Sequence, residues 1–282
     1  MSWPDWSAWG DAVALPVQER IAKPRRVGRT MVIDKGIGLR ELRDMLEVCA
    51  PFIDYIKLAF GTSVLYRPEI LQRKVLAIRN FDVNVYPGGT LFELACAQGK
   101  AEAFVARAKE IGFTCLEVSD GTFEVSQSER RRRIDLGIEA GLSVITEVGK
   151  KDKRASVVAE KILHQLDLDL AWGADMAIVE GRDSGLGVGV YDDDGSPKND
   201  VIEDVLSALH SPERVMWEAP ISAQQQFWIR RLGPGVNLGN VQTKDVLTLE
   251  ATRVALRGDT LKDYAERGLR DFDTAATKKT NF

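Results

Sequence analysis

Histidine and cysteine are scarce in this chain, which has two histidines and three cysteines among 282 residues. Cys49, Cys96 and Cys115 are odd in number and far apart, a pattern that argues against a disulfide framework and against a zinc site. Two histidines also argue against a histidine-based catalytic triad. We therefore expect reduced thiols, a cytoplasmic protein, and chemistry carried by carboxylates, lysines and arginines.

The sequence also lacks long apolar runs and a strong excess of one charge. No run approaches the roughly 18 apolar residues of a membrane-spanning helix, and the tryptophans and aspartates of the first residues are unlike a signal peptide. The net charge of −4 gives no electrostatic reason to expect nucleic acid or an anionic membrane as a partner. We expect neither of them to bind.

What is present is an ordinary globular composition, with 44% apolar and 28% charged residues. Eight short apolar segments rich in β-branched residues are predicted as strands, and the intervals between them are long enough for a helix after each. The predicted strands span 30–34, 55–59, 83–86, 114–118, 143–146, 176–179, 215–218 and 236–238. Eight such units predict a single (β/α)8 TIM barrel over residues 30–260, with a short N-terminal extension (1–29) and a polar C-terminal tail (261–282).

Local signals support several of the intervening helices. Leu39, Leu42, Leu46 and Cys49 recur at helical spacing and predict one buried face. Pro68 is favoured in the first turn of a helix. Ser126 and Glu129 have the spacing of a capping box, which predicts a helix that begins after Ser126.

Acidic residues end five of the predicted strands: Asp34, Glu117, Glu147, Glu180 and Glu218. A single acid at a strand end is often a helix cap or a salt-bridge partner, but five on one rim are harder to explain in that way. In a (β/α)8 barrel, this rim carries the catalytic residues. Oxygen ligands without nearby histidine or cysteine favour Mg²⁺. We predict a magnesium site with Glu117, Asp120, Glu147 and Glu180 as ligands.

Basic residues occur among these acids. Lys57 lies within a predicted strand, where it could pair with acids, bind an anionic substrate or form a Schiff base. Lys150, Lys151 and Arg182 follow two other strands, and a purely structural ion-pair network is the alternative for each. Glycine-rich stretches at the same rim include Gly88-Gly89 and Gly239-Asn240, and freed backbone amides hold anionic oxygens well. Together these features predict a polyanionic, phosphorylated substrate.

Nine segments, in order, resemble those of the phosphosulfolactate synthase family. They are VIDKG (32–36), Lys57 with Gly61-Thr62-Ser63, YPGGTLFE (86–93), EVSDG (117–121), TEVGKK (146–151), EGRDSG (180–185), Glu218-Ala219-Pro220 with Gln224-Gln225, residues 236–240 and RGDT (257–260). The resemblance covers about residues 29–260, and YPGGTLFE with TEVGKK is highly specific. Ala59-Phe60 before Gly61 and the tryptophans of the extension depart from the family pattern.

The resemblance implies a magnesium-dependent, cytoplasmic (β/α)8 barrel, which we expect to be a homo-oligomer. Its substrates would be phosphoenolpyruvate and sulfite, its product 2-phospho-3-sulfolactate, and its pathway a route to coenzyme M or sulfolactate. The chemistry needs a cationic rim, stabilisation of charge on the substrate carboxylate, and a proton for C2.

On this basis we assign roles to the candidate residues. Lys151 is the predicted general acid, with Glu147 and Lys57 as further catalytic residues. The predicted substrate-binding residues are Lys35, Lys150, Arg182, Gly88, Gly89, Gly239 and Asn240. Three alternatives stay open at this point: another enol phosphate or nucleophile, a Schiff-base aldolase that uses Lys57, and a non-catalytic relative of the stress-associated plant members.

Overall fold

The computed structural model describes residues 8–17, 20–149, 155–258 and 260–266. Its strands confirm the predicted order, with bounds that differ mainly at their ends. They are β1 (Thr30–Asp34), β2 (Tyr55–Leu58), β3 (Asn84–Pro87), β4 (Cys115–Val118), β5 (Ser143–Val148), β6 (Met176–Val179), β7 (Val215–Glu218) and β8 (Asn237–Gln242). β8 extends four residues beyond its predicted end, so Gly239 and Asn240 lie within the strand rather than in an exit loop.

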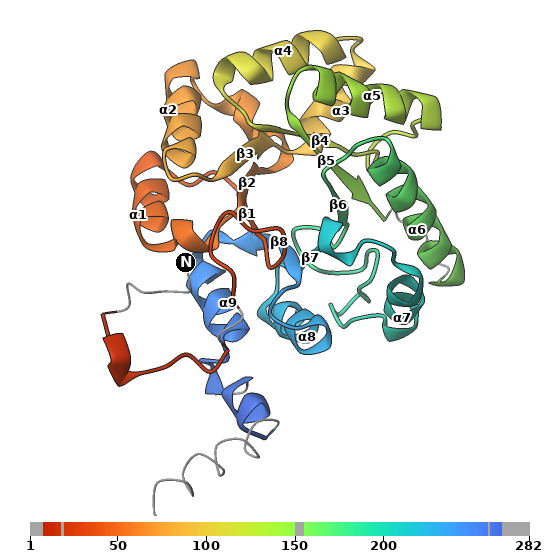
Figure 1. Ribbon diagram of the computed structural model, residues 1–282. Helices are drawn as coiled ribbons and strands as arrows, with labels where there is room; N and C mark the ends of the chain where they lie inside the picture. Colours follow the sequence, from red (N-terminus) through yellow and green to blue (C-terminus); the bar gives the residue numbers. More distant parts are fainter. Residues whose placement is uncertain (1–7, 18–19, 150–154, 259, 267–282) are drawn as a thin grey trace, which may run out of the picture.

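Helices alternate with these strands around the outside of the sheet (Figure 1). They are α1 (Leu39–Cys49), α2 (Pro68–Arg79), α3 (Gly89–Ala97), α4 (Ala101–Ile111), α5 (Gln127–Glu139), α6 (Ala155–Ala171), α7 (Asn199–Ala208), α8 (Ser222–Leu232) and α9 (Val246–Arg253). The predicted face of α1 is confirmed, because Leu42, Leu46 and Cys49 are buried. Pro68 opens α2, and the hydroxyl of Ser126 accepts a hydrogen bond from the amide of Glu129 at the start of α5. No helix in the described ranges is long and apolar enough to cross a bilayer.

All strand pairs are parallel, and the strand order is β3-β2-β1-β8-β7-β6-β5-β4. Pairing of the first strand with the last curls the sheet into a nearly closed barrel, which confirms the predicted fold. The two ends of the order, β3 and β4, lie side by side without a strand ladder between them. Three hydrogen bonds bridge this seam at Thr114: its amide donates to Val85 O (3.0 Å), its Oγ1 accepts from Val85 N (2.9 Å), and its hydroxyl donates to Val85 O (3.3 Å).

Two apolar layers hold the barrel together. Helices pack on its outer surface through two clusters, a larger one that includes Leu46, Val75, Ile162 and Trp228 and a smaller one that includes Phe92, Val105 and Ile134. A separate cluster fills the interior, with one or two side chains from most strands: Met31, Tyr55, Tyr86, Cys115, Ile145, Met176, Ile178 and Met216. The interior is therefore packed at this level, and polar residues above it can form a site only at the carboxyl ends of the strands.

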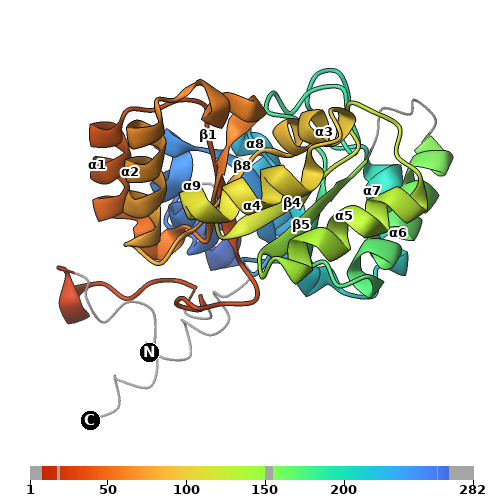
Figure 2. The ribbon, with the colours of Figure 1, turned by 90° about the horizontal axis from the view of Figure 1, so that it is seen from above.

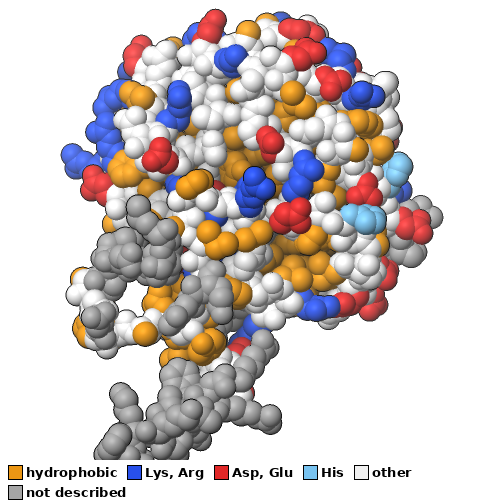
Figure 3. All heavy atoms as spheres, in the orientation of Figure 1, with side chains coloured by type: hydrophobic (Ala, Val, Ile, Leu, Met, Phe, Trp, Pro, Cys, Tyr) orange, Lys and Arg blue, Asp and Glu red, His pale blue; other side chains and the backbone are white. Residues whose placement is uncertain are grey.

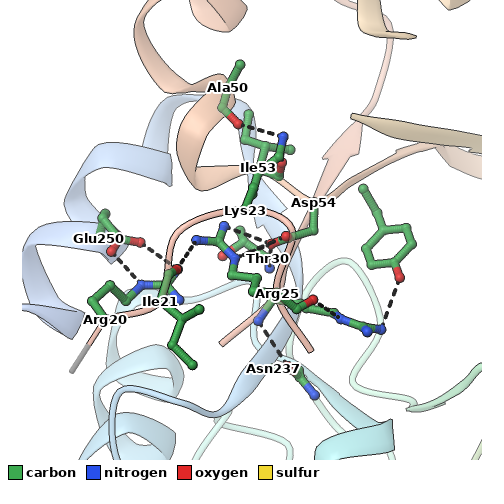
Figure 4. Close-up of polar contacts among 12 residues, drawn as sticks. Arg20, Ile21, Lys23, Arg25, Thr30, Ala50, Ile53, Asp54, Asn237 and Glu250 are labelled. Atoms are coloured by element: carbon green, nitrogen blue, oxygen red, sulfur yellow. Dashed lines mark hydrogen bonds and ion pairs between the residues drawn. The ribbon is translucent and has the colours of Figure 1, made fainter. Parts of the chain in front are cut away.

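The segment before β1 is bound to the opposite end of the barrel, where it runs beneath the sheet in Figure 2. Arg20 pairs with Glu250 (2.7 Å) and Arg25 pairs with Asp54 (2.9 Å), in both cases as buried ion pairs. Lys23 donates to the carbonyls of Ala50 and Ile53 (Figure 4). Residues 20–29 thus close the amino-terminal end of the barrel, and the chemistry is left to the other end.

The molecular surface carries charges of both signs. On the face shown in Figure 3, Lys and Arg side chains lie among Asp and Glu side chains, with apolar groups between them. At the end of the described chain, residues 260–266 are helical, and Asp263 pairs with Arg230 of α8 (2.7 Å). The predicted polar tail therefore begins as an ordered helix against the barrel.

Candidate active site

Strand alternation places one lysine and three glutamates directly above the apolar interior layer. Side chains two residues apart on a strand point to the same face. Tyr55, Cys115, Ile145 and Met216 fill the interior, so Lys57, Glu117, Glu147 and Glu218 must point inward one level higher. Four strands thus deliver four ionisable groups to one place.

Lys57 stands at the centre of this group. Its Nζ lies 3.0 Å from Glu117 Oε2, 3.3 Å from Glu147 Oε2 and 3.7 Å from Glu218 Oε1. All four side chains are buried or nearly so. A single ammonium therefore faces three carboxyl groups in a region from which water is largely excluded, and the interactions between them are correspondingly strong.

Burial and repulsion between carboxylates oppose ionisation of Glu117 and Glu218. Desolvation raises the pKa of Glu218 to about 8, with repulsion from Glu147 adding to the rise and Lys57 opposing it. Desolvation likewise raises the pKa of Glu117. Desolvation alone would lower the pKa of Lys57, but attraction to Glu117, Glu147 and Glu218 raises it well above its ordinary value. Because a protonated ammonium is not a nucleophile, this environment argues against the Schiff-base alternative.

Backbone amides fix two of the glutamates. The amide of Gly89, in the first turn of α3, donates to Glu117 Oε1 (2.8 Å), and the amide of Gly181 donates to Glu218 Oε2 (2.9 Å). A side chain on Gly89 would contact Ser119 Oγ and come within 2.7 Å of Glu117 Oε1. Glycine is thus required at position 89 for the close approach of α3 to β4.

A cavity of about 180 Å³ opens above Lys57. Glu117, Glu147 and Glu218 form part of its wall; the others are Ile33, Ala59, Phe60, Gly88, Gly89, Thr90, Glu180, Arg182, Asp183 and Asn240. At the mouth, Lys35 pairs with Asp183 (3.0 Å), and both side chains are partly exposed. The Oδ1 of Asn240 is buried without a hydrogen-bond partner in the described chain, so the wall retains an unused polar atom.

The structure brings most of the predicted site residues to this cavity, with exceptions that have physical causes. Gly239 faces the apolar layer, where a Cβ would lie 2.9 Å from Met31 Cε, and it does not line the cavity. Asp120 pairs with the buried Arg130 (3.4 Å) and is not part of the cavity wall. Lys150 and Lys151 lie outside the described residues.

One strand-end acid serves the scaffold instead. Ile33 points into the barrel, so Asp34, the next residue, points outward toward the helices. There it pairs with Lys74 of α2 (2.6 Å) and accepts hydrogen bonds from the amides of Gly36 and Ile37. Glu218, in contrast, is a strand-end acid with no role in the site predicted from the sequence, although its two-residue offset from Met216 signals that it points inward.

The predicted magnesium ligands do not converge as a set. Within the described ranges, no three acidic, histidine or cysteine side chains are arranged to hold a metal ion. Glu117 and Glu147 face Lys57, whereas Glu180 lines the same cavity from the position directly after β6. The donor chemistry still fits Mg²⁺, because carboxylate oxygens outnumber the single ammonium in this cavity.

A larger cavity of about 600 Å³ lies elsewhere, between α2, α3 and α4. Its wall is mostly apolar and includes Leu71, Leu91, Leu94 and Phe104. Among the described residues, Lys100 and Arg107 are its only charged lining residues, and no Asp, Glu, His or Cys side chain lines it. The smaller polar cavity above Lys57 is therefore the candidate active site.

A family model and two relatives that match this chain carry the same enzyme description. A family model described as (2R)-phospho-3-sulfolactate synthase (ComA) matches residues 18–259. The chain is 41% identical over 244 residues to the phosphosulfolactate synthase of Methanothermobacter thermautotrophicus, covering 86% of this chain and 94% of that protein. It is 38% identical over 235 residues to the phosphosulfolactate synthase of Methanocaldococcus jannaschii, covering 83% and 93%.

A solved structure supports the fold independently. The crystal structure of 3-hexulose-6-phosphate synthase from Salmonella typhimurium matches with a TM-score of 0.50 at 16% identity, covering 85% of this chain and 99% of that one. At this level of identity, the likeness shows the barrel fold alone. What the cavity binds has to be argued from the family and from the residues that line it.

Proposed function

Because this chain belongs to the phosphosulfolactate synthase family, it is a lyase that adds sulfite to phosphoenolpyruvate, and we propose that the new bond forms in the cavity above Lys57. The observation that carries this assignment is the ammonium of Lys57, held protonated among three glutamates at the floor of a cavity at the carboxyl ends of the strands. The product is 2-phospho-3-sulfolactate.

The reaction sets out what the cavity must do. The lone pair of the sulfite sulfur forms a bond to C3 of phosphoenolpyruvate, and the electron pair of the C2–C3 double bond moves onto C2 and its carboxylate. C2 then takes up one proton, which completes the addition. The site must therefore bind two anions together, stabilise charge on the carboxylate and deliver a proton.

Lys57 is placed to stabilise the developing charge. Its ammonium is fixed from three sides, so little reorganisation is needed when negative charge appears nearby. The three glutamates keep the ammonium protonated. When one or more of them is itself protonated, it is neutral and does not repel the anionic substrate. Lys57 in this role is an electrostatic catalyst and not a nucleophile.

The mouth of the cavity supplies the groups for substrate binding. Arg182 and Gly88 line it, and Lys35 lies at its edge with Asp183. A guanidinium matches the oxygens of a phosphate or carboxylate in pairs, whereas a lysine acts as a point charge. We assign the phosphate and carboxylate of phosphoenolpyruvate to these residues.

A magnesium ion is part of this proposal. Glu117, Glu147 and Glu180, the predicted ligands that line the cavity, would hold it. When bound, the ion would neutralise charge on the substrate carboxylate.

We assign proton delivery to C2 to Lys151, which follows β5 and its Glu147. We further propose a cytoplasmic, homo-oligomeric enzyme, and the three unpaired cysteines are compatible with a reducing compartment.

The direct test is incubation with phosphoenolpyruvate, sulfite and Mg²⁺, followed by detection of the adduct by mass spectrometry. We expect a product that contains both the phosphate and the sulfonate, and no product after removal of divalent ions with a chelator until Mg²⁺ is restored. Turnover with a different nucleophile or enol phosphate, but not with this pair, would contradict the assignment, as would a complete lack of turnover.

Arg182→Ala is expected to weaken substrate binding more than it slows the chemical step. Loss of one charge-assisted contact costs roughly 1.5–3 kcal/mol, which raises the KM for phosphoenolpyruvate by roughly 10-fold to 100-fold. Steady-state kinetics with each substrate varied in turn measures this effect. Arg107→Ala, an exposed arginine on α4, is the matched control. An unchanged KM in Arg182→Ala would mean that this side chain serves the barrel and not the substrate.

A further inference from the structure

The seam between β3 and β4 lacks the ladder of the other strand pairs, and side chains make much of its hydrogen bonding. Toward its carboxyl end, the amide of Gly89 donates to Glu117 Oε1 (2.8 Å), so one of the glutamates around Lys57 is itself a seam contact. The geometry of the site therefore depends on how firmly α3 is attached to β4 and to the loop that follows it.

Glu93 makes that attachment. It lies on α3, its side chain is buried, and its Oε1 accepts a hydrogen bond from Ser119 Oγ (2.7 Å). Its Oε2 accepts from the amides of Thr122 (2.8 Å) and Phe123 (3.2 Å). Within the described ranges no Lys or Arg pairs with Glu93, so its carboxyl group is satisfied by neutral donors from the β4–α5 loop alone.

This contact and the site share one small volume. The two side-chain oxygens nearest to the position that a Cβ on Gly89 would occupy are Ser119 Oγ and Glu117 Oε1. Ser119 is held by Glu93, and Glu117 is held by the Gly89 amide next to it. Ser119 and the Glu117 carboxyl group therefore face the same side of Gly89, and Glu117 Oε2 lies 3.0 Å from Lys57 Nζ.

We propose that Glu93 is a positioning residue for the synthase reaction. It clamps the β4–α5 loop to α3, and through Ser119 and Gly89 this clamp sets the place of Glu117 and hence of the Lys57 ammonium. The role rests on the proposed function, since it concerns the geometry of that site. Glu93 does not line the cavity, so it acts through these neighbours and does not touch the substrate.

The test compares Glu93→Ala with Glu93→Gln. Alanine removes every contact to the loop, and a misplacement of about 1 Å can cost on the order of 10²-fold in rate, so we expect kcat to fall by about that factor with little change in KM. Glutamine can still accept from Thr122 and Phe123 with its carbonyl and donate to Ser119 with its amide, so it should restore most of kcat. Glu110→Ala, an exposed glutamate on α4, is the matched control.

Hydrogen exchange of the Gly89, Thr122 and Phe123 amides reports the clamp without reference to activity. These amides should exchange faster in Glu93→Ala than in the wild type and in Glu93→Gln. Should Glu93→Ala fail to fold, Ser119→Ala removes only the Ser119 contact and should still lower kcat. Hydrogen exchange tests the clamp even if the wild type shows no synthase activity. A lack of activity would refute the proposed function but not the clamp.

Two results would overturn the positioning role. Wild-type kcat in folded Glu93→Ala or Ser119→Ala would show that the clamp does not govern the site. Equal loss of kcat in Glu93→Gln and Glu93→Ala, with normal exchange in the glutamine variant, would show that the charge or proton of Glu93 is needed instead.

Discussion

Lys57→Met is expected to abolish most activity and to destabilise the barrel more strongly as the pH rises. Removal of the ammonium leaves Glu117, Glu147 and Glu218 facing one another without a cation. Breaking a buried ion pair by removing one partner typically costs about 3–5 kcal/mol. Loss of a preorganised electrostatic group at the reacting centre typically lowers kcat by about 10²–10³-fold.

The direction of the pH effect follows from the pKa of the glutamates. Burial raises the pKa of Glu218 from its ordinary 4.5 to about 8, so between these values the folded state binds its proton more tightly than the unfolded state. The free energy of unfolding therefore falls as the pH rises through this window. Without Lys57, which lowers the pKa of Glu117 and Glu218, these two groups retain their protons still more strongly, so the deficit of the variant grows from pH 5 to pH 8.

Thermal unfolding of both proteins at several pH values between 5 and 8, in the absence of divalent ions, measures this difference. Lys262→Met removes an exposed lysine and is the control for loss of one positive charge. A deficit in Tm that is constant with pH would contradict the presence of titrating glutamates around Lys57. Full activity in Lys57→Met would remove this lysine from the mechanism altogether.

Lys151→Met is the second variant for which we expect a large effect. Loss of a general acid typically lowers the rate by about 10²–10⁴-fold, and the effect should appear in kcat at saturating substrate. Lys150 is assigned to binding of the phosphate or sulfonate, because consecutive side chains that leave a strand diverge. Lys150→Met should therefore raise the KM values while leaving kcat much less affected.

Kinetics of the two variants side by side make the assignment falsifiable. The reverse pattern would exchange the two roles, and normal turnover in both variants would exclude either lysine as the acid. The solvent deuterium isotope effect on kcat gives a second measurement. An unchanged isotope effect in Lys151→Met would indicate that another group delivers the proton to C2.

The scaffold followed from local patterns that the sequence displays directly. Apolar segments spaced for a helix between them gave all eight strands in order, and the helical spacing of Leu42, Leu46 and Cys49 gave the buried face of α1. Such periodicities reflect the geometry of a single strand or helix, so they can be recognised without knowing the neighbours. The motif resemblance added the family, which the comparisons confirm.

The arrangement of the site was only partly accessible in this way. Alternation along each strand determines that Lys57, Glu117 and Glu147 point inward, and it could have placed Glu218 with them and Asp34 with the helices. It cannot determine which inward groups meet, because β2, β4, β5 and β7 are brought together by closure of the sheet. The tertiary structure alone decided that Lys57 is shared by three glutamates, that Asp120 pairs with Arg130, and that Glu93 of α3 accepts a hydrogen bond from Ser119 after β4. These contacts join residues that are distant in the chain, and their energies depend on burial and distance, which no local pattern encodes.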